Sequence, residues 1–231
     1  MSKERTETIT CPDCGKKSEF TIWESINTMV DPQTKSAVRD LSLFQFTCPN
    51  CGSKTFINYG FLYHQMEDKI MIQYAPTEEY AEQFKKQIEF FRSGDLPAVM
   101  RSVLSDNYLL RIVRSINEFQ EKLSIFDAGL DDRIVEMYKI MILPLVFKQV
   151  PEPEEAEMFF ERIGGKDYIQ VVVKGKVFGG AEIDADMYKI LEESSAGTIP
   201  DLRNDELIID RNYAFKAMES IAKNLDNNLF K

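Results

Sequence analysis

The sequence contains one five-residue pattern twice, as Cys11-Pro12-Asp13-Cys14-Gly15 and as Cys48-Pro49-Asn50-Cys51-Gly52. These two motifs hold all four cysteines of the 231-residue chain. Two residues between the cysteines let one tight turn direct both sulfurs at a single point, and the following glycine permits the positive φ that such a turn needs. Four thiolates from two such turns form a closed tetrahedral shell, which suits a structural Zn²⁺. We therefore expect one zinc ion bound by Cys11, Cys14, Cys48 and Cys51.

We compared the zinc prediction with the spacing of the two motifs and with the other roles that paired cysteines can have. The motifs are separated by 33 residues, whereas the pairs of a compact ribbon lie roughly 15–20 residues apart, so a folded segment must fill the extra length. Disulfides are disfavoured because nothing marks the chain as secreted. A thioredoxin-type redox pair opens a helix, but here glycine and strand-like sequence follow each motif. Four cysteines complete the ligand set, so the single histidine, His64, is not expected to be a ligand.

Composition limits the class of protein. The hydrophobic fraction of 44% is ordinary for a globular protein with a core. No apolar run reaches the roughly 18 residues of a membrane span, and residues 1–8 have no apolar segment of a secretory signal. We therefore expect a cytoplasmic protein with reduced cysteines and no membrane association.

The formal net charge of −10 is concentrated at the C-terminal end. Residues 1–76 carry 8 basic and 9 acidic side chains, residues 77–150 carry 10 and 12, and residues 151–231 carry 10 and 17. A protein that holds phosphate backbones should show a basic stripe, and the acidic end should repel nucleic acid and anionic lipid. Weak nucleic-acid binding is expected, although a local basic patch around Lys16, Lys17 and Lys54 stays open.

Residues 1–76 read as a β-domain that carries the two motifs at one end. Alternating or β-rich sequence predicts strands over residues 18–27, 43–47, 55–59, 61–65 and 69–74. Between the motifs, Asp31 and Pro32 resemble the N-cap and first position of a short helix that ends near Arg39. Together these elements predict an antiparallel sheet.

Residues 77–150 read as helical. The apolar side chains of Tyr80, Phe84, Ile88 and Phe91 share one helical face, and a second helical pattern covers residues 107–126. Gly129 is expected to end that helix, and Asp131 to cap the next one, which Pro144 ends or kinks.

Residues 151–231 read as a small, acidic α+β module. Residues 151–155, Pro-Glu-Pro-Glu-Glu, are the best linker candidate. Strands follow at residues 158–163 and 168–173 around a Gly-Gly-Lys turn, and at 176–183, where Gly179 and Gly180 predict a bulge. Asp184 and Asp210 are expected to cap two helices.

The chemistry-bearing motifs of common enzymes are absent. The sequence has no G-x-x-x-x-G-K-[ST] phosphate loop, no G-x-G-x-x-G fingerprint and no H-E-x-x-H helix. One histidine and four committed cysteines leave no evident nucleophile–base couple. No catalytic and no cofactor-binding residue is predicted beyond the four zinc ligands.

These residues resemble the CpXC domain of bacteria and archaea, a family named for its two Cys-Pro-x-Cys motifs. The resemblance also includes the aromatic strand Thr-Ile-Trp-Glu-Ser-Ile-Asn at 21–27, the Asp31-Pro32 turn, the apolar entry at 43–48 and Leu-Tyr-His at 62–64. It extends over roughly residues 9–130 and leaves out the C-terminal module. It implies a zinc-ribbon-like fold with Cys11, Cys14, Cys48 and Cys51 as ligands, and no assigned activity.

The sequence thus predicts an α+β protein with a zinc-ribbon-like antiparallel β-domain (1–76), a helical middle (77–150) and an acidic α+β module (151–231). The favoured function is that of a cytoplasmic, non-enzymatic protein-binding or adaptor protein. The alternatives are a nucleic-acid-associated regulator that uses the zinc ribbon, and an enzyme with an unrecognised site. Protein partners are expected, including a second copy of the chain bound through the helical middle, because its apolar stripes need burial.

Overall fold

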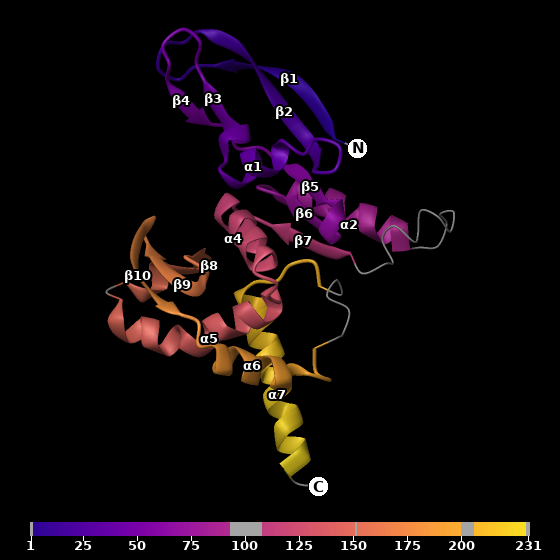
Figure 1. The fold of residues 1–231 in the computed structure, drawn as a ribbon, viewed down its shortest axis with the longest axis vertical. Helices are drawn as coiled ribbons and strands as arrows, with labels where there is room; N and C mark the ends of the chain where they lie inside the picture. The colour runs from indigo at the N-terminus through magenta and orange to yellow at the C-terminus, as the bar shows by residue number, and fades with distance from the viewer. Residues whose placement is uncertain (1, 93–107, 151, 200–205, 230–231) are drawn as a thin grey trace. The chain divides into compact units, whose positions relative to one another are not determined.

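The computed structural model describes residues 2–92, 108–150, 152–199 and 206–229, and it is a mixed α+β structure (Figure 1). Its described part contains six α-helices and three β-sheets. The chain forms two compact units, Met1–Ile116 and Asn117–Lys231. Their boundary falls inside the stretch predicted as one helical region. The linker candidate at residues 151–155 falls inside the second unit, where Pro153–Glu155 is a 3₁₀-helix and Pro151 lies outside the described residues.

The first unit is built on a five-stranded sheet with the order β1-β2-β5-β6-β7. Its strands are β1 (Lys3–Thr10), β2 (Lys17–Asn27), β5 (Phe61–Gln65), β6 (Ile70–Tyr74) and β7 (Leu109–Val113). The expected antiparallel sheet is wrong in two pairings, because β2 pairs with β5 and β6 pairs with β7 in parallel. Parallel neighbours need a crossover rather than a hairpin, and residues 28–60, which include the second motif, form the crossover between β2 and β5.

Two strands of this sheet do not follow from the hydrophobic pattern. β1 is a mostly exposed edge strand with the sequence Lys-Glu-Arg-Thr-Glu-Thr-Ile-Thr, which lacks an apolar face. β7 lies where a helix was expected, and all five of its residues are buried. A short apolar run fits either structure, and pairing with β6 makes it a strand. Asn107, the expected start of that helix, lies outside the described residues.

The crossover holds α1 (Thr34–Arg39), a 3₁₀-turn at Ser42–Phe44, and the two-stranded sheet of β3 (Gln45–Thr47) and β4 (Lys54–Phe56). The predicted N-cap at Asp31 is wrong. The helix begins at Thr34, and the N-cap residue is Gln33. The backbone carbonyl of Asp31 accepts from the N–H of Thr34 at 3.0 Å, so Asp31 belongs to the turn before the helix.

Helix α2 (Glu78–Arg92) follows β6 in this unit. The predicted apolar stripe is confirmed, since Phe84 and Ile88 are buried together with Ala81. Tyr80 is half-buried, and the side chain of Phe91 lies outside the described part. The helix therefore presents an apolar face, as its periodicity indicates.

The second unit combines a three-stranded antiparallel sheet with four helices. The sheet has the order β10-β9-β8 and consists of β8 (Ala156–Ile163), β9 (Lys166–Val173) and β10 (Lys176–Glu182). The helices are α4 (Ile116–Asp127), α5 (Asp132–Gln149), α6 (Ala185–Ser195) and α7 (Arg211–Leu229). Met158 and Phe160 on β8 pack with Val135 and Tyr138 on α5 in one core. The register shift between Val177 and Gly179 is the bulge predicted at the glycines.

Most of the predicted helix ends in this unit are confirmed. Asp131, Asp184 and Asp210 each accept a hydrogen bond at 2.9 Å from a backbone N–H two or three residues later. Gly129 has a φ of 74° just beyond α4. Pro144 does not end α5, which continues to Gln149. Within the described residues no helix is both long and apolar enough to cross a membrane.

Candidate metal centre

Each Cys-Pro-x-Cys-Gly motif forms the turn of a β-hairpin, the first between β1 and β2 and the second between β3 and β4. In the first turn, the Cys11 N–H donates to the carbonyl of Lys16 at 2.9 Å, and the Gly15 N–H donates to the carbonyl of Cys11 at 3.0 Å. The second turn repeats both hydrogen bonds at the matching positions, at 2.8 and 2.9 Å. Gly15 and Gly52 have φ values of 68° and 74°, as the motif predicts.

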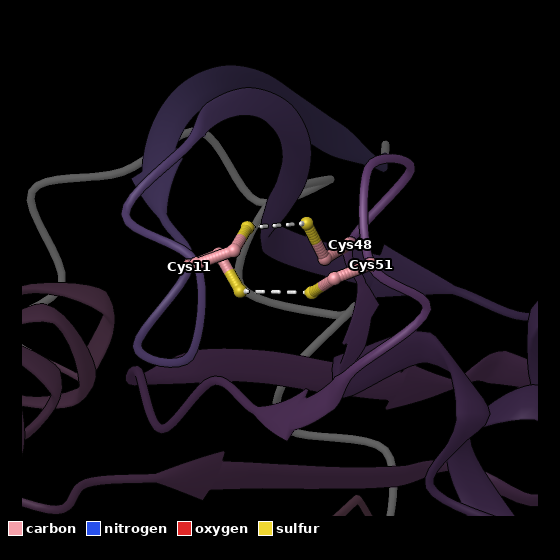
Figure 2. Close-up of side chains that lie close together, drawn as sticks. Cys11, Cys48 and Cys51 are labelled. Atoms are coloured by element: carbon pink, nitrogen blue, oxygen red, sulfur yellow. Dashed lines mark hydrogen bonds between the residues drawn. The ribbon is translucent and has the colours of Figure 1, made fainter.

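The two turns bring all four sulfurs together. The four Sγ atoms lie within 4.8 Å of one another. Cys11 Sγ is 3.7 Å from Cys51 Sγ, and Cys14 Sγ is 3.7 Å from Cys48 Sγ, across the two hairpins (Figure 2). A disulfide needs an S–S distance of about 2.05 Å. Sulfurs at ~2.3 Å from a tetrahedral Zn²⁺ lie ~3.8 Å apart, so the two measured distances match edges of a zinc tetrahedron.

A small hydrophobic cluster supports the sulfurs. Cys11 and Cys48 are buried and pack with Phe46 of β3, and Phe20 and Ile57 are among the partly buried residues around them. The rings of Phe20 and Phe46 meet edge to face, with centroids 6.0 Å apart. One cysteine of each hairpin is therefore fixed in this cluster, whereas Cys14 is partly exposed and Cys51 is exposed.

The electrostatics of the cluster favour a bound cation. A backbone hydrogen bond from Lys16 lowers the pKa of Cys14 to about 6, and the Asn50 amide, which donates to Cys14 Sγ at 3.5 Å, acts in the same direction. For Cys51, the Ser53 backbone N–H lowers the pKa, but Cys14, burial and the other sulfurs outweigh it and raise the pKa to about 12. Cys14 thus forms a thiolate readily, whereas Cys51 holds its proton. A divalent cation at the centre favours the thiolate form, so the donor set fits a thiophilic metal ion.

Other candidate ligands do not join this site. His64 lies on β5, its Nε2 is 3.0 Å from the hydroxyl of Tyr108, and burial lowers its pKa. Within the described parts of the chain, no second group of three or more potential ligands is close enough to hold an ion. The sequence did not point to Asn50, because the x position of the motif carries no fixed chemistry. Its contact with Cys14 depends on how the two hairpins face each other.

Comparison with known proteins agrees with this geometry. The family model described as CpXC protein matches residues 9–139. No curated protein and no solved structure matches the chain. The matched stretch holds both motifs, includes α4 and ends within α5, so it covers more than half of the 231 residues. By this match and its paired Cys-Pro-x-Cys hairpins, the chain belongs to the CpXC protein family.

Proposed function

We propose that the four cysteines hold a structural Zn²⁺, and that the chain is a cytoplasmic, non-enzymatic protein-binding or adaptor protein. The cluster of four sulfurs, with two cross-hairpin distances of 3.7 Å, carries the metal part of this proposal. Four thiolates leave no open coordination position for water or substrate, so the ion would support the fold and do no chemistry.

The two facing hairpins also support a zinc-ribbon-like assignment for this region. β3 and β4 have three residues each, and the cluster beneath the sulfurs has Cys11, Phe46 and Cys48 as its buried members. So small a core offers little hydrophobic stabilisation of its own. A metal ion that joins the hairpins would provide the missing cross-link.

The protein-binding part is supported by β10. All seven residues of this strand are exposed, including Val177 and Phe178 at 64% and 51% of their full surface. Within the described residues, β10 pairs on one side, with β9, and forms an edge of its sheet. An exposed, apolar edge strand can accept a strand from a partner, and the acidic balance of residues 151–231 favours a basic partner.

We also propose self-association through the helical middle, and the proposal now depends on the few apolar side chains that are exposed there. Phe84 and Ile88 are buried within the first unit, and Phe119, Leu123 and Met137 within the second. The exposed large apolar side chains on the described helices of this region are Phe90, Leu145 and Phe147. Light scattering is expected to show a dimer that Leu145→Asp weakens. A clean monomer at high micromolar concentration would contradict self-association.

Metal analysis of the purified full chain tests the zinc assignment directly. We expect about one zinc per chain, and Zn–S distances of ~2.3 Å by X-ray absorption. Cys48→Ser is expected to lower the zinc content and to replace one sulfur in the shell. Zinc bound elsewhere with four free thiols, or turnover that needs zinc while the four-sulfur shell is intact, would count against a structural role.

A nucleic-acid-associated role is the second candidate. Lys16, Lys17 and Lys54 are all exposed and lie in or directly after the two motif turns. With a chain charge of −10, we expect weak binding to random duplex DNA at physiological salt. Sub-micromolar binding in an anisotropy titration that Lys54→Gln weakens would promote this role above the adaptor role.

A further inference from the structure

A pocket of about 430 Å³ lies within the first unit and is lined by strands of the five-stranded sheet and by α2. Gln73 of β6 and Leu62 of β5, which are register partners, line the sheet side. Tyr80 and Gln83 line it from α2. The volume falls in the range of small-molecule sites, which combine apolar walls with a few placed polar groups.

Gln73 contributes a side-chain carbonyl oxygen, Oε1, that can accept a hydrogen bond in this pocket. Its side-chain amide nitrogen donates to the backbone carbonyls of Phe61 at 3.1 Å and Tyr74 at 2.9 Å, so both of its N–H groups are used. The residue is 8% exposed, and no described residue donates a hydrogen bond to its Oε1. Because Oε1 is not one of the fully buried atoms that lack a partner, it is open to the pocket and can accept a hydrogen bond from a bound molecule. The pocket is therefore prepared for a ligand that carries an N–H or O–H group.

Two tyrosines are part of the pocket lining. A Cβ atom at Gly60 would lie 2.6 Å from three ring carbons of Tyr80, so the Tyr80 ring lies directly against the backbone of Gly60. The ring of Tyr59 also lines the pocket, and the Tyr59 hydroxyl accepts from the Trp23 N–H at 3.3 Å. Two tyrosines in the lining favour a ligand with a planar ring, which packs well against aromatic side chains.

Two cationic side chains, Lys3 and Arg5, are also part of the pocket lining. Lys3 and Arg5 are exposed residues of β1, and both pair with Glu24, with Arg5 Nε 3.3 Å from Glu24 Oε1. Arg5 also pairs with Glu7 at 2.7 Å. Exposed ion pairs of this kind are weak, whereas Arg binds phosphate strongly through two parallel hydrogen bonds. An acidic ligand group can therefore displace these carboxylates.

We infer that this pocket binds a nucleoside monophosphate or a ligand of the same chemistry, namely a planar ring with an N–H donor and an acidic group. The ring donates to Gln73 Oε1 beside the tyrosines, and the phosphate lies at Lys3 and Arg5. The lining has one carboxylate and no histidine or cysteine, and the inference concerns binding of the ligand and no reaction of it. This inference is independent of the zinc and adaptor proposals.

Calorimetric titration of the zinc-loaded full chain with AMP, GMP, CMP and UMP tests the inference. At least one monophosphate is expected to bind more tightly than both its nucleoside and inorganic phosphate. Arg5→Gln should weaken it about fivefold, the effect of one exposed charge contact. Glu24→Gln should tighten it by freeing the cations. The matched control, Lys17→Gln, removes a charge from the exposed start of β2, which is not part of the lining.

Gly60→Ala tests the ring part of the site separately. The added methyl group must displace the Tyr80 ring, so the variant should lose affinity for the monophosphate, while circular dichroism shows an intact fold. The inference is overturned if no monophosphate binds at millimolar concentration. It is equally overturned if Lys17→Gln weakens binding as much as Arg5→Gln, or if inorganic phosphate alone binds as well as the best monophosphate.

Discussion

Each of the two units contains a cluster of ionisable side chains, and the two clusters differ in the charges that they combine. In the first unit, the four cysteine sulfurs gather within 4.8 Å of one another. In the second unit, a buried cluster alternates in sign and consists of Glu121, Lys122, Asp132, Glu136 and Lys139. Lys139 Nζ is 2.6 Å from Glu121 and 2.8 Å from Glu136, and Lys122 Nζ is 3.2 Å from Asp132.

The difference separates a candidate metal site from a group of ion pairs inside the protein. Like charges at short range need a cation from outside the chain. The mixed cluster contains its own counter-ions, and Glu121 also accepts from the Phe160 backbone N–H at 2.5 Å, which ties α4 to β8. Lys122 likewise donates to the Ile209 carbonyl at 2.9 Å.

Loss of the metal should have the largest effect on the stability of the fold. Structural zinc contributes about 10–16 kcal/mol to folding in zinc-finger peptides. A strong chelator, or Cys48→Ser, is therefore expected to increase hydrogen exchange of residues 1–76 first, because the hairpins lose their cross-link. The amides of α5 and β8 serve as the internal reference and should stay protected. An equal increase of hydrogen exchange in both units would contradict the prediction that the metal stabilises the first unit alone.

Removing a lysine from the mixed cluster should have the next largest effect on the free energy of unfolding. Lys139→Met removes the cation shared by Glu121 and Glu136 and leaves buried carboxylates uncompensated, which costs about 3–5 kcal/mol. The matched control is Lys189→Met on α6, where the lysine side chain is 69% exposed and the change should stay within about 0.5 kcal/mol. Urea unfolding of both variants measures the difference. Equal stability of the two variants would mean that the buried lysine does not hold the cluster together.

The same cluster predicts an alkaline limit to stability. Burial alone would lower the pKa of Lys139, but Glu121 and Glu136 outweigh it and raise the pKa above its ordinary value of 10.5. A raised lysine pKa stabilises the fold fully below 10.5, and this stabilisation is lost as pH rises through the folded-state pKa. The unfolding free energy of the wild type should therefore fall above that pH, relative to its value near neutrality. Lys139→Met should show a smaller fall, and parallel pH profiles would contradict the prediction.

Much of the candidate metal site could be predicted from sequence because its determinants are local. Each motif contains its own cysteines and the glycine that closes its turn, and the caps at Asp131 and Asp184 are equally local. The structure confirms these features because each depends on residues within one turn. The family resemblance, predicted over roughly residues 9–130, is confirmed over 9–139.

The features that sequence reasoning missed depend on distant partners. β7 became a strand because β6 lies beside it, and β1 because β2 does, although β1 has no apolar face. Lys122 and Glu136 look like solvated helix residues in the sequence, yet both are buried. The side-chain amide nitrogen of Gln73 donates to two backbone carbonyls, and one of them belongs to Phe61 on the neighbouring strand. No local pattern encodes such neighbours.

The smallest expected effect concerns Asn50, whose side chain donates to a cysteine sulfur of the candidate metal centre. Asn50 donates to Cys14 Sγ at 3.5 Å, and this hydrogen bond helps to lower the pKa of Cys14. Asn50→Ala keeps all four ligands but removes that donor, so zinc affinity should fall by roughly tenfold, the low end for residues that support a metal ligand. Competition with a chromogenic chelator at fixed pH measures the change.

Asp13 provides the matched control for this variant, because it occupies the same position of the first motif and its carboxylate cannot donate a hydrogen bond. Asp13→Ala should leave zinc affinity within twofold, or raise it as a negative charge is removed next to the thiolates. Asn50→Asp should weaken zinc binding more than Asn50→Ala, because it loses the donor and adds a charge of the wrong sign. If the alanine variants of both positions lose the same affinity, the effect belongs to the turn backbone. If Asn50→Ala alone loses affinity, the second hairpin tunes a ligand that the first hairpin supplies.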